Sequence, residues 1–154
     1  DSLGETLEKL GPLMNEGALL VMAVPNFGSI QRRMFNRHWF HLDLPRHLVH
    51  LEVGWLKRQL REVGITDMEV RSFDLLQNLY GFIQSMLNAL VPTKPNRLYH
   101  LLKFRGERRT IELTGWLVAA LLLAPFAVIE TAFATLRGEG ASLILYGRQG
   151  SRGD

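Results

Sequence analysis

One uninterrupted apolar run, residues 18–24, most constrains how this chain folds. Gly17 opens the run, and Pro25 and Asn26 close it. A continuous apolar run of strand length is typical of a strand buried on both faces, as in a parallel sheet covered by helices. Ligands of open α/β sheets bind outside the carboxyl ends of such strands. The sequence therefore predicts a site at Asn26 and in the loop that follows it.

That loop contains the densest group of polar and titratable side chains in the chain. Four of the five histidines lie there with one acid and one arginine: His38, His41, His47, His50, Asp43 and Arg46. Histidine titrates near pH 7, and a guanidinium pairs well with anionic groups. The loop is therefore the first candidate for chemistry.

Composition narrows the class of protein. The chain has 154 residues, 47% apolar and 21% charged, which is typical of one globular domain. The absence of cysteine excludes disulfides, cysteine nucleophiles and thiolate metal sites. The net charge is only +3, and no basic stripe interleaved with aromatics accompanies it, so we expect no nucleic-acid partner. The first residues are polar and acidic, unlike a signal peptide, and we expect a cytoplasmic protein. The missing initial methionine leads us to expect a fragment.

Periodicity predicts the elements along the chain. Helical spacing continues from about residue 3 to residue 10 or 14, and an amphipathic stripe over residues 51–63 ends at Gly64. The remaining predicted elements are an edge strand over 66–73, helices over 75–90 and 96–104, and a last strand over 141–146.

The run from Leu113 to Ile129 carries no charge and follows a basic patch made of Lys103, Arg105, Arg108 and Arg109. A helix that is apolar all round is either buried or in lipid. Seventeen helical residues reach about 26 Å, which is short for a full span, and Pro125 interrupts the run. Two alternatives stay open: peripheral membrane contact through residues 96–136, or a lid over a hydrophobic pocket.

Three segments resemble class I S-adenosylmethionine-dependent methyltransferases. Residues 17–26, after a leucine-rich helix, resemble the fifth strand of that family. Residues 37–50, with the helix that ends at Gly64, are similar to the loop and helix of one bacterial branch. In that branch a helical insertion separates the sixth and seventh strands. In this chain residues 75–137 lie in the same way between the predicted strands 66–73 and 141–146. The implied fold class is α/β: the C-terminal part of a Rossmann-like doubly wound methyltransferase sheet (residues 1–74 and 138–148), with a helical apolar insertion (residues 75–137) before the last strand.

The resemblance implies transfer of a methyl group from S-adenosylmethionine to a small or lipid-like acceptor. In the family, a glycine-rich loop after the first strand and an acidic residue after the second strand hold the cofactor. Neither is present, and the glycines at 138 and 140 precede a strand instead of following one. We therefore expect no cofactor-binding residue here and no activity from the fragment alone. The segment 51–53 also departs from the family, whose members tend to start this helix with Thr-Pro.

Methyl transfer requires positioning and, for oxygen or nitrogen acceptors, a destination for the proton. We therefore predict two groups of site residues. The predicted catalytic residues are His41, His47 and His50. The predicted substrate-binding residues are Asn26, Phe27, Trp39, Asp43 and Arg46.

Other interpretations compete with these roles. Asp43 and Arg46 would equally suit a structural ion pair, the imidazoles could pack beside aromatic rings, and Asn26 suits a strand-terminating turn. A metal site built from the histidines and Asp43 is a third reading, but its spacing matches no standard zinc pattern, and we predict no metal. The alternative to an enzyme is a membrane-associated, non-catalytic binding or structural module that uses residues 96–136.

Overall fold

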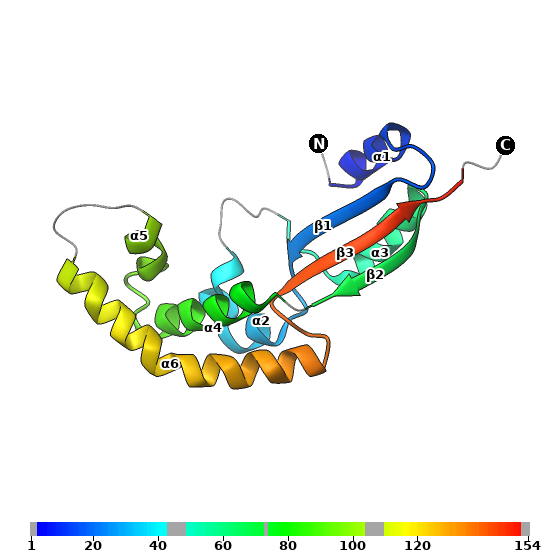
Figure 1. Ribbon diagram of the computed structural model, residues 1–154. Coiled ribbons are helices and arrows are strands. Elements are labelled where there is room, and N and C mark those ends of the chain that lie inside the picture. The colour runs from blue at the N-terminus through cyan, green and yellow to red at the C-terminus, as the bar shows by residue number, and fades with distance from the viewer. Residues whose placement is uncertain (1–2, 43–48, 73, 104–109, 152–154) are drawn as a thin grey trace.

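The computed structural model describes residues 3–42, 49–72, 74–103 and 110–151. In chain order its elements are α1 (Leu3–Leu13), β1 (Leu19–Pro25), α2 (Ile30–Phe35), the 3₁₀ helices η1 (Asn36–His38) and η2 (Phe40–Leu42), α3 (Val53–Glu62), β2 (Ile65–Arg71), α4 (Leu75–Leu90), α5 (Arg97–Lys103), α6 (Thr110–Leu136) and β3 (Ser142–Gln149). Every predicted helix and strand is present, with ends shifted by a few residues. The chain is therefore a mixed α/β protein (Figure 1).

The last strand of the chain lies in the middle of the sheet. β3 is hydrogen-bonded on one side to β1 and on the other to β2, and it runs antiparallel to both (Figure 1). The expectation that residues 18–24 pair in a parallel ladder is therefore wrong for the described strands. β1 and β2 do point the same way, but β3 separates them. An irregularity between Thr66 and Glu69 of β2, with Asp67 at a φ of 47°, shifts the register of the second pairing.

One face of the sheet is packed conventionally. α1 and α3 cover it, and leucines and one isoleucine from both helices and the strands form a buried core: Leu7, Leu51, Leu56, Leu60, Ile65 and Leu145. Gly64 ends α3 with a φ of +87°, a backbone conformation that glycine adopts without the strain of a Cβ. The predicted amphipathic helix is therefore present, and its apolar stripe faces the sheet.

The opposite face of β1 is open. Leu19 is 57% exposed and Val21 is 51% exposed, so the prediction of a strand buried on both faces is wrong for this chain. No helix among the described residues covers the face on which these side chains lie (Figure 1). The outer edge of β1 also has no partner strand within the described residues, apart from a single bridge between Asn26 and Leu51.

The remaining helices form a second layer beyond the carboxyl end of β1 (Figure 1). α4 contacts α2, both 3₁₀ helices and α6. Asp74 caps α4, because its Oδ1 accepts a hydrogen bond from the backbone N–H of Gln77 at 3.0 Å. A small apolar cluster of Phe35, Trp39, Phe82 and Ala127 joins α2, η1, α4 and α6. α6 is longer than the predicted run and continues through Pro125.

Candidate functional site

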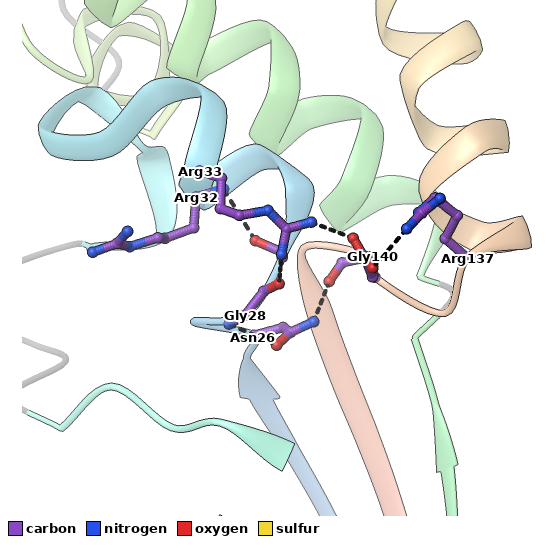
Figure 2. A network of polar contacts seen from close by, with 8 residues as sticks. Asn26, Gly28, Arg32, Arg33, Arg137 and Gly140 are labelled. Atoms are coloured by element: carbon purple, nitrogen blue, oxygen red, sulfur yellow. Dashed lines mark hydrogen bonds and ion pairs between the residues drawn. The ribbon is translucent and has the colours of Figure 1, made fainter. Parts of the chain in front are cut away.

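The turn after β1 ties the end of that strand to the start of β3 (Figure 2). Asn26 is buried, and its Nδ2 donates to the carbonyl of Gly140 at 2.8 Å. Its Oδ1 accepts from the N–H of Gly28 at 3.0 Å. Both polar atoms of the amide therefore bond to backbone, as in the turn interpretation of this residue. The predicted contact of Asn26 with substrate stays a prediction.

An ion-pair network holds the same turn from outside (Figure 2). Ser29 caps α2 by accepting from the N–H of Arg32 at 3.1 Å. Arg33 donates to the carbonyl of Gly28 at 2.7 Å and pairs with Glu139, which also pairs with Arg137 at 3.6 Å. The hydrogen bond from Arg33 lowers the pKa of the Glu139 carboxyl. The sequence analysis did not identify α2 or this network, because six residues are too few for a periodic signal.

His41 lies where the sequence predicted chemistry, at the carboxyl end of β1. It belongs to η2, its side chain is largely buried, and its Nε2 is 3.3 Å from the carbonyl oxygen of Gln77. The ring lines a cavity of about 190 Å³ between β1, β3 and the start of α4. The other lining residues are Ala23, Val24, Pro25, Asp74, Gln77, Ser142 and Ile144.

Two residues of α4 fix the position of the His41 ring. A Cβ at Gly81 would lie 2.5 Å from Nε2 of His41, so the helix reaches the imidazole only because residue 81 is glycine. One turn further along, Oγ of Ser85 accepts from the backbone N–H of Phe40 at 2.8 Å. The rings of Trp39 and Phe40 stand edge-on to His41 at 5.4 and 5.2 Å. The contacts with α4 and with the two aromatic rings therefore hold the imidazole in one position.

Phe27 and His50 come together at a different cavity. Their ring centroids are 5.0 Å apart, and both residues line a cavity of about 410 Å³ with Trp55 and Arg58. Nε2 of His50 is buried and has no hydrogen-bond partner. The structure thus places His41 and His50 at separate cavities, with the buried Trp39 ring in contact distance of both Phe27 and His41.

Three predicted site residues, Asp43, Arg46 and His47, lie outside the described residues. Their predicted roles in substrate binding and catalysis stay predictions, as does the ion pair between Asp43 and Arg46. Within the part of the chain that the structure describes, no group of three or more histidine or acidic side chains is placed to hold a metal ion.

A buried carboxyl that the sequence did not single out, Glu130, contacts Gln31 of α2. Oε2 of Glu130, on α6, accepts from Nε2 of Gln31 at 2.9 Å, and the same Gln31 nitrogen donates to the carbonyl of Asn78 at 2.8 Å. Burial raises the pKa of the Glu130 carboxyl, and the bond from Gln31 partly opposes that rise. The only sequence feature that could have pointed to Glu130 was its charge, because it is the first charged residue after seventeen uncharged ones.

The turn after β1 and the cavity beside His41 do not fit S-adenosylmethionine. The cavity beside His41 is smaller than the roughly 300–1,000 Å³ of ordinary small-molecule sites. The four backbone N–H groups of the turn after β1, residues 27–30, already donate within the protein, to Leu51, Asn26 and Glu139. A turn whose donors are bonded internally does not cradle a ligand. We therefore assign no cofactor contact to these residues, and the expectation that the cofactor site lies outside this chain stays a prediction.

The chain has distant structural likeness to a Haemonchus contortus enzyme. It is similar to phosphoethanolamine N-methyltransferase 2 in complex with phosphomonomethylethanolamine and S-adenosylhomocysteine, with a TM-score of 0.40 and 10% identity. For the same enzyme in complex with S-adenosyl-L-methionine the TM-score is 0.43 and the identity 8%. Each likeness covers 98% of this chain and 30% of the other. No protein-family model and no curated protein matches the sequence. At these TM-scores the likeness assigns neither a fold nor an activity to this chain.

Proposed function

We propose that this chain is the C-terminal part of a class I methyltransferase that transfers a methyl group from S-adenosylmethionine to a small or lipid-like acceptor in the cytoplasm. The resemblance of residues 17–26 and 37–50 to that family supports the proposal. The sheet is compatible with it, because the three segments that resemble the fifth, sixth and seventh strands belong to one sheet.

The observation that carries the proposal is the open side of β1. In a doubly wound sheet the inner strands are paired on both edges and covered on both faces. Here the outer edge of β1 has no partner strand among the described residues, and Leu19 and Val21 are exposed on its open face. In this proposal, further strands of a Rossmann-like sheet pair with that edge, and they carry the glycine-rich loop for the cofactor.

His41 is the residue best placed to serve the acceptor. It lies at the carboxyl end of β1, where ligands of such sheets bind, and Asp74 and Gln77 line the same cavity. When an oxygen or nitrogen acceptor gains a methyl group, it releases a proton, and the imidazole is the proposed proton acceptor. The proposal leaves no catalytic role for His50, which lines the other cavity.

The test uses the full-length protein that contains this chain. We expect it to bind S-adenosylmethionine in calorimetry and to transfer a radiolabelled methyl group into a lipid or small-molecule extract. His41→Ala should leave cofactor binding unchanged and lower the transfer rate by about 10²–10⁴. A full-length protein that does not bind the cofactor would refute the proposed methyltransferase activity. Micromolar binding by residues 1–154 alone would refute the placement of the cofactor site outside this chain.

A glycine pair provides a second test that leaves the histidine itself intact. Gly81→Ala should displace the His41 ring, because the new Cβ has no space beside Nε2. Gly115→Ala, on α6, adds the same methyl group where no atom lies within 4 Å, and it is the matched control. We expect the first variant, but not the second, to lower the transfer rate. Equal rates in the two variants would show that the position of His41 does not matter to the reaction.

A further inference from the structure

The outer surface of α6 is apolar along its whole length. Ten large apolar side chains on this helix are exposed: Ile111, Leu117, Val118, Leu121, Leu122, Phe126, Val128, Ile129, Phe133 and Leu136. The two carboxylates of the helix are turned toward the protein, where Glu112 pairs with Arg97 and Glu130 accepts from Gln31. The polarity of α6 is therefore the reverse of that expected for a helix on a water-facing surface.

α4, the neighbour of α6, shows the same reversal. Its buried side chains include four polar ones: Asn78, Gln84, Ser85 and Asn88. Gln84 donates to Asn88 at 2.8 Å, and Asn88 donates to Asn96 at 2.8 Å. The leucines at both ends of the helix, Leu75, Leu76 and Leu90, are exposed. Polar groups thus bond to one another inside the layer, beside the buried Phe82 and Leu87, while the apolar groups of α6 and of the ends of α4 face out. This is the arrangement expected of helices in contact with hydrocarbon.

The charge of the chain is concentrated in the same segment. Residues 75–137 contain seven lysines and arginines and three glutamates, a balance of +4, whereas the whole chain carries +3, so the rest of the chain carries −1. Of the three glutamates, Glu112 is ion-paired with Arg97 and Lys94, and Glu130 is buried. A cationic segment with an apolar face matches a surface of anionic lipid.

We propose that the outer face of α6, with the exposed ends of α4, docks on an anionic lipid bilayer and lies in the plane of one leaflet. This proposal is independent of the enzymatic one. α6 is long and apolar enough to cross a membrane, by length and composition. Its inner face, however, packs against α4, and Glu130 bonds to Gln31 of α2. Crossing the bilayer would break those contacts, whereas lying in the plane preserves them.

A second copy of the chain fits this face less well. A symmetric pair of α6 helices would bring two segments of charge +4 together, and like charges oppose such a contact. The same cations favour phosphatidylglycerol head groups. Lipid is therefore the occupant to which we commit.

Flotation with vesicles tests the docking. We expect the chain to float with vesicles of phosphatidylcholine and phosphatidylglycerol at 3:1, and at least tenfold less with phosphatidylcholine alone. The double variant Leu121→Asp/Leu122→Asp should lower the partition coefficient at least tenfold, because it puts two charges on the proposed lipid face. The control is Leu13→Asp, which changes a leucine on α1 that is at least as exposed as Leu121 and Leu122, and it should bind as the wild type does. Circular dichroism checks that each variant is folded.

The absence of cysteine allows a depth measurement without background labelling. Leu122→Cys lies near the middle of α6 and Leu136→Cys at its end. With a fluorescent label at each site, brominated lipids should quench both at the same shallow depth if the helix lies in the plane. A label on Gln59→Cys, on α3, should not be quenched.

Four results would overturn the proposal. The first is no flotation with either vesicle. The second is flotation that the double aspartate variant does not weaken. The third is a label at position 122 at the bilayer centre with position 136 at its surface, which indicates a span. The fourth is a dimer that vesicles do not dissociate and that the double variant converts to a monomer. This result would show that a second copy of the chain, and not lipid, covers the outer face of α6.

Discussion

The two layers of this protein follow opposite rules of burial. In the sheet layer, Leu56 and Leu60 of α3 are completely buried, while Lys57, Arg58 and Arg61 lie outside the buried core of that helix. In the helical layer the buried positions of α4 include three amides and a serine beside Phe82 and Leu87, and the outer face of α6 is leucine, isoleucine, valine and phenylalanine. One chain thus combines an apolar interior with a partly polar one.

The difference shows that each layer is specified by a different interaction. Leucines in the sheet layer gain by leaving water, and their packing needs only complementary volume. Buried amides gain nothing from leaving water, so each must find a partner of the correct geometry. Directional bonds therefore act beside a small apolar cluster to hold the helical layer in one arrangement, and the apolar groups on the outer face of α6 remain free to contact something else.

The largest expected effect is a difference in stability loss between one leucine substitution in the sheet layer and one in the helical layer. Leu60→Ala should lower the free energy of unfolding by about 2–5 kcal/mol, because it opens a cavity in the sheet core. Leu121→Ala, at a side chain that is 73% exposed, should change it by less than about 0.5 kcal/mol in lipid-free solution. Urea denaturation measures both values. Equal losses would show that α6 is packed in a way the structure does not contain.

The second prediction concerns the polar interior. Asn88→Ala should cost about 1–3 kcal/mol, because Nε2 of Gln84, Oδ1 and the backbone N–H of Asn96, and the carbonyl of His38 lose their bonds to Asn88. Gln59→Ala removes an amide whose bond to Glu62 is exposed, and this control should change stability by less than about 0.5 kcal/mol. If Asn88→Leu is more stable than the wild type, the polar network is not what holds this layer together.

The third prediction uses the buried carboxyl of Glu130. Burial raises the pKa of this group in the folded protein above the 4.5 of its ordinary range. The cost of burying its charge is therefore present above the folded pKa and disappears as the pH falls through that pKa toward 4.5. Glu130→Gln retains an acceptor for Gln31, so it should be more stable than the wild type at pH 8.

Denaturation at a series of pH values checks this sign. The advantage of Glu130→Gln should shrink as the pH falls from 8 to 4.5. A variant that is less stable than the wild type at pH 8 would show that the charged form of Glu130 is stabilised, and the comparison between the layers would then need revision at this position.

The smallest effect is expected at the ion pair between α5 and α6. The bidentate hydrogen bond from Arg97, at 2.7 and 2.5 Å, lowers the pKa of Glu112 from 4.5 to about 2. A lowered pKa stabilises the fold above 4.5, and that contribution is lost as the pH falls from 4.5 to about 2. Glu112→Gln should therefore be slightly less stable than the wild type at pH 7. Thermal melts at pH 7 and pH 3 in low salt measure the difference, which should be smaller at pH 3. A difference that does not change between these pH values would argue against the pair.

Local sequence was sufficient for most elements. The stripe over residues 51–63 and the glycine at 64 identified α3 and its end, and the spacing over 75–90 matched the bounds of α4. Helix and strand patterns repeat over a few residues, so they are readable from the sequence alone. For the candidate site, the sequence indicated only its region: His41 follows the end of β1 as expected, but no sequence pattern indicated that Asp74, Gln77 and Ser142 would line its cavity.

The sequence by itself determined which segments form the longer helices and the strands, to within a few residues at their ends, that residues 113–129 are helical and uncharged, and that His41 follows a strand. Only the tertiary structure decided that β3 lies between β1 and β2, which leaves one edge and one face of β1 open. It also decided that α4 turns its amides inward while α6 turns its leucines outward. The physical reason is that periodicity defines the faces of an element but not the element that each face meets. That choice depends on strand pairing and hydrogen bonds between residues as far apart as Gln31 and Glu130.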